Sequence, residues 1–130
     1  MLEQLKIRHK PKLSYFKEYF KDCRRIIKVN EEFLKSEKGD YLSSEAIIYS
    51  LVLRLRGAFI IKSIMSNETY TYERFNSWIK DKLSEIDFNL VYGAYRSSKN
   101  EKKVKQKIKV GDVRLLLKFL KNELSILENG

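Results

Sequence analysis

The chain has 130 residues and a formal net charge of +10, since 27 Lys and Arg face 17 Asp and Glu. This length predicts one domain over 1–130, and a hydrophobic share of 43% is too high for a disordered chain. One cysteine excludes an internal disulfide and a multi-thiolate zinc site, so with a single histidine we expect no metal and no cofactor. Five glycines and one proline are few breaks, which favours long helices and an all-α fold.

Residues 1–12 form a short basic segment, which we expect to be an N-terminal arm. They lack the apolar run of a secretion signal, so we expect a soluble, cytoplasmic protein. A first helix is predicted from about Ser14, because apolar residues then recur at helical spacing until Gly39 ends it. Its stripe includes Cys23, which we expect to be a buried structural thiol, and Asn30, which would need a hydrogen-bond partner if buried.

The most apolar stretch lies between Ser43 and Asn67 and reads SSEAIIYSLVLRLRGAFIIKSIMSN. Apolar residues fall on nearly every side of its helical wheel, which is typical of a central helix wrapped by others. We expect this helix over about 43–66, with Ser43 or Ser44 as its N-cap and Asn67 just after its last turn.

Two arginines, Arg54 and Arg56, stand in the middle of the apolar stretch. They argue against a membrane span, so we expect no membrane, and their spacing directs them to nearly opposite sides of a helix. A buried guanidinium needs a partner. The carboxylates we considered are Glu45, Glu73, Glu85 and Asp87. One interpretation is a structural ion pair or an arginine that reaches the surface; the other is an anion site in a groove beside the helix.

Two shorter helices are predicted next, over about 72–83 and 88–99. Thr71 is expected to cap the first of these helices. The same helix contains Trp78, the only tryptophan of the chain, which is expected in the core. The last helix is predicted to begin at Gly111 and Asp112 and to carry two apolar lines, one with nearly coiled-coil spacing. Two lines indicate two neighbours, one of which could be another subunit. The elements together predict an antiparallel up-and-down bundle of four to five helices.

A candidate nucleic-acid site lies where the fourth predicted helix meets a basic segment over 97–110, which we expect to be an exposed, mobile loop. Its residues are Tyr92, Tyr95, Arg96, Lys99, Lys102, Lys103, Lys105, Lys107 and Lys109. Lysines bind phosphates and tyrosines stack on bases, so this combination suits an RNA or DNA strand. The alternative is a tyrosine pair in the core followed by a solvated loop. The net charge itself fits either an anionic partner or simple solubility.

Three segments together resemble a HEPN-type helical domain, of the kind associated with minimal nucleotidyltransferases in archaea. They are LVLRLRGAFIIKSI at 51–64, YGAYR at 92–96 and VGDVRLLLKFL at 110–120. The resemblance covers most of the chain and rests on pattern. It implies a helical bundle that is often dimeric, so we expect a homodimer, and it implies partnership with a nucleotidyltransferase. Some members of the family are metal-independent ribonucleases.

The ribonuclease members carry a histidine shortly after an arginine in this region. Arg96 matches the arginine, but 100–103 contains no histidine, and His9 is far away in the sequence. Without an imidazole no general acid or base of near-neutral pKa is evident. We therefore predict a non-catalytic protein, with no catalytic residues, that binds a partner nucleotidyltransferase and/or its nucleic-acid substrate. The alternatives are a small basic nucleic-acid-binding protein and an atypical HEPN-type ribonuclease that lacks the usual histidine.

Overall fold

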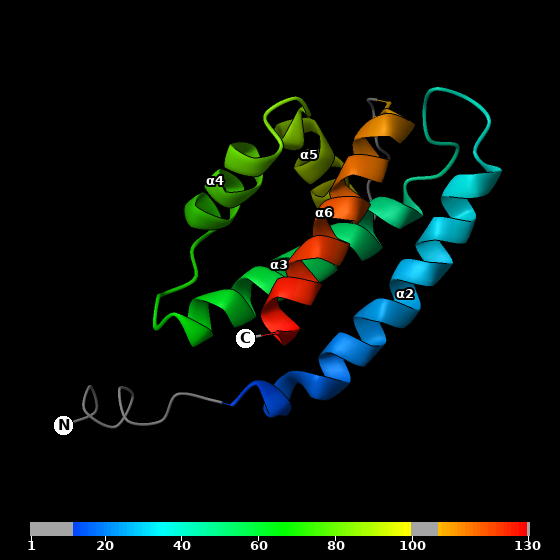
Figure 1. Cartoon of the computed structure of the whole chain (residues 1–130). Helices are drawn as coiled ribbons and strands as arrows, with labels where there is room; N and C mark the ends of the chain where they lie inside the picture. Colours follow the sequence, from blue (N-terminus) through cyan, green and yellow to red (C-terminus); the bar gives the residue numbers. More distant parts are fainter. Residues whose placement is uncertain (1–11, 100–106, 130) are drawn as a thin grey trace.

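The computed structural model describes residues 12–99 and 107–129 (Figure 1). Its elements are η1 (Leu13–Phe16), α2 (Lys17–Ser36), α3 (Ala46–Met65), α4 (Tyr72–Lys82), α5 (Phe88–Lys99) and α6 (Val110–Glu128). Between these helices the described residues form one strand-like bridge, from Tyr41 to Lys109. The predicted all-α bundle is confirmed.

The bundle is organised around α3, which packs against α2, α5 and α6 (Figure 1). Ile48 and Leu55 of α3 are completely buried. The cover is nevertheless incomplete, because Tyr49, Leu53 and Ile64 remain 37%, 36% and 38% exposed. The predicted central position of this helix is therefore confirmed, but one of its apolar faces stays open to solvent.

Helices α2 and α3 run antiparallel. Near its start α2 contacts the middle of α3, where the Tyr19 hydroxyl donates to the Arg54 carbonyl at 2.8 Å. Further along α2, the buried Asn30 donates through Nδ2 to Ser50 Oγ at 3.5 Å, which supplies the partner that its burial requires. Cys23 lies fully buried on the same side of α2, and burial raises the pKa of its thiol. It is the structural thiol that we expected.

The predicted hydroxyl caps differ in their contacts at the starts of α3 and α4. Helix α3 begins at Ala46, slightly later than predicted, and Ser44 Oγ accepts from the Ala46 N–H at 3.3 Å. Ser43, the other predicted cap, donates instead to a carboxylate of the preceding loop. At the start of α4 the predicted cap is confirmed, because Thr71 Oγ1 accepts from the Arg74 N–H at 3.1 Å.

The end of α3 is closed by Asn67, as predicted. Asn67 has a φ of 56°, in the left-handed region that asparagine tolerates better than most residues. The Glu68 N–H donates to the Ser63 carbonyl at 2.8 Å, and the Asn67 N–H donates to the Ile64 carbonyl at 3.1 Å. This pair of bonds is a Schellman motif, which satisfies carbonyls that the helix leaves without partners.

The residues just before α6 are fixed to the loop that follows α2. The Leu42 N–H donates to the Ile108 carbonyl at 2.9 Å, and the Val110 N–H donates to the Asp40 carbonyl at 2.9 Å. Ile108 is only 1% exposed. The prediction of an exposed loop over 97–110 is therefore wrong for Ile108 and Val110, which are buried, although Lys107 and Lys109 are exposed. Residues 97–99 belong to α5, and 100–106 lie outside the described residues.

Helices α4 and α6 meet through Trp78, which is partly buried and packs against the core as predicted. Its ring centroid lies 5.0 Å from that of Phe59 on α3 and 4.8 Å from that of Phe119 on α6. No helix in the described part of the chain is long and apolar enough to cross a membrane. Of the predicted N-terminal arm over 1–12, only Lys12 is described.

Candidate functional site

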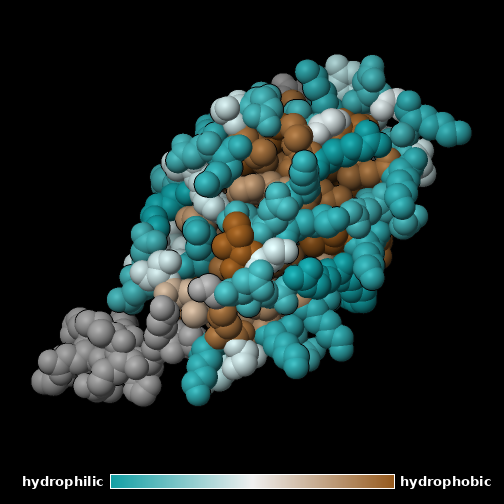
Figure 2. Space-filling view, viewed as in Figure 1, coloured by the Kyte–Doolittle hydropathy of each residue, from teal (hydrophilic) through white to brown (hydrophobic). Residues whose placement is uncertain are grey.

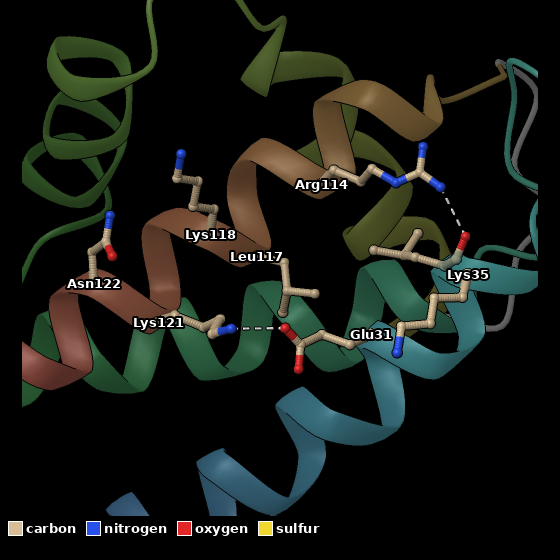
Figure 3. A pocket seen from close by; sticks show the side chains of 8 residues that line it. Glu31, Lys35, Arg114, Leu117, Lys118, Lys121 and Asn122 are labelled. Carbon is tan, nitrogen blue, oxygen red and sulfur yellow. Dashed lines mark hydrogen bonds and ion pairs between the residues drawn. The ribbon is translucent and has the colours of Figure 1, made fainter.

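A groove of about 500 Å³ lies between α2 and α6 (Figure 3). Apolar side chains from both helices, Leu34 and Leu117, belong to its lining. The charged residues that line it are Lys35, Arg114, Lys118 and Lys121, with Glu31 as the acid. Figure 2 shows the corresponding face, on which apolar side chains are visible between hydrophilic ones.

The spacing of these residues explains why they gather there. Arg114, Lys118 and Lys121 are four and three residues apart, so they lie along one side of α6. Glu31 and Lys35 are four residues apart on α2 for the same reason. The apolar stripes of α2 and α6 pack into the core, and the polar positions that flank the stripes border the groove.

Two of the groove's cations are held by protein groups. Arg114 donates through Nη2 to the Leu34 carbonyl at 2.9 Å, in the last turn of α2, where helix carbonyls lack intrahelical partners (Figure 3). Lys121 Nζ lies 2.8 Å from a Glu31 carboxylate oxygen. No carboxylate balances the charge of Arg114 within the described residues, because its partner is a neutral carbonyl, whereas Glu31 balances the charge of Lys121.

The positive charges of the remaining two lysines, Lys35 and Lys118, are hardly balanced by carboxylates. Lys35 pairs with Glu32 at 3.1 Å, but both side chains are 73% exposed, and such pairs contribute little. Among the described residues, Lys118 has no hydrogen-bond or ion-pair partner. The groove is thus a hollow with a surplus of positive charge, which attracts anions.

The cationic surface continues past the end of the groove. The C-terminal end of α2 and the N-terminal end of α6 meet there, and Lys107 and Lys109 immediately precede α6. Lys107 Nζ lies 5.9 Å from the ring centroid of Tyr41, and Tyr41 is exposed. One of the predicted nucleic-acid-binding lysines, Lys107, therefore lies beside a ring that solvent can reach, and Lys109 is paired with Tyr41 through the backbone.

The tyrosines of α5 are less available than the sequence suggested. Tyr95 is only 3% exposed and its ring stacks on that of Tyr49, with centroids 5.5 Å apart. It cannot stack on a base there, so the core alternative holds for this residue. Tyr92 is half-buried against Tyr72, and burial raises the pKa of its hydroxyl. Arg96 is exposed.

The other predicted binding lysines are placed as follows. Lys99 is the last residue of α5, and the described residues leave out Lys102, Lys103 and Lys105. None of the residues predicted on α5 lines the groove between α2 and α6. The structure therefore separates the α5 tyrosines from the groove, and it brings Lys107 and Lys109 to the end where α6 begins.

Arg54 belongs to a structural ion pair. Its Nη2 lies 3.5 Å from an Asp22 carboxylate oxygen on α2. None of the four carboxylates considered from the sequence is its partner. A hydrogen bond from Arg25, together with the charges of Arg25 and Arg54, holds the pKa of Asp22 below its ordinary value. The partner was missed because Asp22 is far from Arg54 in the chain and approaches it only through the packing of α2 on α3.

Arg56 has a different environment, on the open face of α3. Its Nε donates to the Tyr70 hydroxyl at 3.2 Å, and its guanidinium lies 5.4 Å from the centroid of the same ring. The hydrogen bond with Tyr70 raises the pKa of Arg56. Across 12–99 and 107–129, no carboxylate lies within ion-pair distance of it. The groove interpretation therefore stays open for Arg56.

The groove was not predicted from the sequence, although part of its signal is present there. Arg114, Lys118 and Lys121 have helical spacing in the segment whose leucines predicted the last helix. The matching cation on α2, Lys35, cannot be assigned from spacing, because only tertiary packing brings α2 beside α6.

No group of three or more His, Cys, Asp or Glu side chains in the described part of the chain is placed to hold a metal ion. No protein-family model, curated protein or solved structure matches the chain. The fold and the site together define the chain as an all-α bundle with a cationic groove between two of its helices.

Proposed function

We propose that this chain is a non-catalytic helical binding protein whose α2–α6 groove holds the phosphate backbone of RNA or DNA. The observation that carries the proposal is the charge of the groove, where four basic side chains face one carboxylate. Lysine and arginine supply most phosphate contacts in such complexes, and these contacts orient the nucleic acid without reading its sequence.

A polymeric anion fits better than a small one, because the cations continue beyond the groove. Lys109 and Lys107 follow the start of α6 outward to the exposed ring of Tyr41. A strand with phosphates in the groove would therefore meet further lysines and one aromatic face. Stacking on such a face tolerates any base, which favours a single strand of mixed sequence.

The experiment is a binding titration with a labelled single-stranded RNA and a labelled duplex DNA, followed by fluorescence anisotropy. Contacts with about three phosphates predict a fall in affinity of roughly 20–40-fold between about 50 and 200 mM salt. The absence of binding at the lowest salt would refute the proposal and would leave the net charge as a matter of solubility.

Charge-reversal variants locate the binding surface. The pair Lys35→Glu and Lys118→Glu acts in the groove, and both side chains are exposed, so folding is not expected to suffer. The matched control pair is Lys17→Glu and Lys80→Glu, on α2 and α4, which changes the net charge equally away from the groove. We expect the groove pair to lose at least tenfold in affinity and the control pair much less. Equal losses would mean that only the total charge matters.

A second candidate function is the binding of a partner protein, and the uncovered apolar face of α3 favours it. The resemblance to HEPN-type domains suggests a nucleotidyltransferase as that partner, and the homodimer that it also suggests stays a prediction. The groove pair Lys35→Glu with Lys118→Glu and the single change Leu53→Asp separate the two functions. Loss of nucleic-acid affinity in the groove pair supports the first function, and dissociation of a protein complex by Leu53→Asp supports the second.

An atypical ribonuclease is the remaining alternative. It predicts turnover of RNA in metal-free buffer that Arg96→Ala abolishes. If RNA stays intact over hours at saturating protein, the ribonuclease alternative is refuted.

A further inference from the structure

One face of α3 carries an exposed apolar stripe with a cation in its middle. The α3 stripe consists of Tyr49, Leu53, Arg56, Ile60 and Ile64, which are spaced four, three, four and four residues apart. This spacing places them along one side of a helix for a length of about 22 Å. Three of its members are more than one third exposed, although each is apolar or aromatic.

The patch extends beyond α3 through a row of tyrosine rings. The ring centroids of Tyr49 and Tyr95 are 5.5 Å apart, those of Tyr95 and Tyr92 are 5.4 Å apart, and those of Tyr92 and Tyr72 are 4.7 Å apart. Tyr72 at the start of α4 is 37% exposed. Tyr95 is buried, so the row of rings joins the exposed Tyr49 of α3 to the exposed Tyr72 of α4 beneath the surface. The exposed apolar side chains of the α3 stripe are more than a single exposed residue, and such a group marks an interaction site.

Arg56 gives this surface its chemistry. Tyr70 engages its Nε and lies under its guanidinium, which holds the side chain in one place. Its two Nη nitrogens have no hydrogen-bond acceptor among the described residues. A partner that covers the stripe removes water from this guanidinium, and an unpaired charge buried in that way is costly. The partner therefore has to supply a negative group.

We propose that the α3 stripe docks an amphipathic helix of a partner protein, and that this helix places a carboxylate against Arg56. The proposal deepens the protein-binding half of the proposed function and rests on it. Apolar positions at three- and four-residue spacing match the knobs of a second helix, and a guanidinium pairs most strongly with a carboxylate in a two-pronged contact.

A second copy of this chain fits the stripe less well. If two copies packed their stripes about a two-fold axis, Arg56 would lie close to the same residue of the other copy. Like charges would then be brought together out of water, which costs free energy. A nucleic acid also fits poorly, because a charged phosphate backbone does not bury the aliphatic side chains of the α3 stripe. The charge of Arg56 thus selects a partner protein with an acidic residue in its apolar stripe.

The test uses a displayed library of helical peptides of about 20 residues, in which all positions of one face vary. Peptides that bind the full wild-type chain are retained, and peptides that also bind the Leu53→Asp variant are removed. We expect the recovered peptides to share apolar residues at heptad spacing with one Asp or Glu between them. Recovery of no peptide, or of peptides without an acidic residue in the stripe, would overturn the proposal.

A double-mutant cycle then tests the ion pair. In the best recovered peptide, replacement of the acidic residue by its amide should weaken binding about tenfold or more, because charge-assisted hydrogen bonds are strong. Arg56→Gln in the protein should cause a similar loss, and the two changes together should add little. Independent, additive losses would contradict the contact. The peptide change leaves the protein untouched, so it remains informative if Arg56→Gln folds poorly.

Two controls define the surface. Ile64→Ser should abolish peptide binding, whereas Ile126→Ser, at an exposed isoleucine of α6, should not. Sedimentation of the wild-type chain shows whether it self-associates, and a dimer broken by Leu53→Asp would assign the stripe to a second copy instead. No residue of the stripe lines the α2–α6 groove, so nucleic-acid binding should survive Ile64→Ser. Failure of one proposal is thereby distinguished from failure of the other.

Discussion

Tyr19 of α2 lies directly against Gly57 of α3, so closely that no larger residue fits at position 57. A Cβ atom built at Gly57 would stand 2.8 Å from Cζ of Tyr19 and closer still to its hydroxyl oxygen. The same hydroxyl donates to the carbonyl of Arg54 at 2.8 Å. The missing side chain of Gly57 therefore lets a tyrosine of one helix hydrogen-bond to the backbone of the other.

Gly57→Ala should lower the free energy of unfolding. In an exposed helix this change is stabilising by roughly 0.8–1.0 kcal/mol, because alanine has the better helix propensity. At position 57 the added methyl group meets the Tyr19 ring, and overpacking of this kind costs about 1–3 kcal/mol. Urea unfolding followed by circular dichroism measures the difference.

The matched control for this variant is Gly93→Ala on α5. A Cβ atom there meets nothing within 4 Å, so this variant should be as stable as the wild type or more stable. A second check is Tyr19→Leu combined with Gly57→Ala, in which the two losses should not add. Equal gains in stability from both glycine substitutions would show that Tyr19 does not restrict position 57.

Asn67→Ala should destabilise the protein by about 1 kcal/mol, because alanine is strained at a left-handed φ. Asn67→Gly should leave stability nearly unchanged, since glycine adopts this conformation without strain. Ser66→Ala is the neighbouring control, because Ser66 has an ordinary φ of −95°. Thermal unfolding of the three variants provides the comparison, and an Asn67→Ala protein as stable as the Ser66→Ala protein would contradict the prediction.

The Asp22 carboxylate should make stability depend on pH in the acid range. Its hydrogen bond from Arg25, and the charges of Arg25 and Arg54, hold its pKa in the folded protein below the ordinary value of 3.8. The ionised form therefore favours folding, and this contribution is present above that value and is lost as the pH falls through the lower folded pKa.

The measurement compares the wild type with Asp22→Asn by urea unfolding at about pH 7 and about pH 2. We expect the variant to be the less stable protein at pH 7 and the difference to shrink at pH 2, because protonation of Asp22 in the folded protein removes the contribution of its ionised form. An undiminished difference at pH 2 would mean that the ionised carboxylate is not the source.

Ile108→Ala should destabilise the protein by about 2–5 kcal/mol, as large-to-small substitutions at fully buried positions do. Val29→Ala, at a side chain that is 57% exposed on α2, should change stability by about 0.5 kcal/mol or less. Urea unfolding of both variants makes the comparison. Equal, small effects would show that the segment before α6 is not anchored in the core.

Much of the fold could be predicted, because helix periodicity and capping are local properties. The predicted helix over 88–99 coincides with α5, and the one predicted over 72–83 differs from α4 only at its last residue. Thr71 and Asn67 close helix ends as their side-chain chemistry suggested. Of the two predicted N-caps of α3, only Ser44 accepts from a backbone N–H of the helix, whereas Ser43 contacts the preceding loop.

The candidate site could be predicted only in part. The lysines before α6 were recognised from their charge, and two of them lie at the end of the groove. The groove itself needs Lys35 and Arg114, which are far apart in the chain and meet because α2 packs on α6. The tyrosine pair of α5 looked accessible from its pattern, yet packing against α3 buries Tyr95.

By itself the sequence determined the helices, the central position of α3, the burial of Cys23 and the basic character of the protein. These follow from residue order and side-chain chemistry alone. The tertiary structure alone decided that Arg54 meets Asp22, that cations of α2 and α6 share one groove, and that one apolar face of α3 stays uncovered. The reason is that periodicity shows which face of a helix requires cover, whereas only the packing of the whole chain shows which faces receive it.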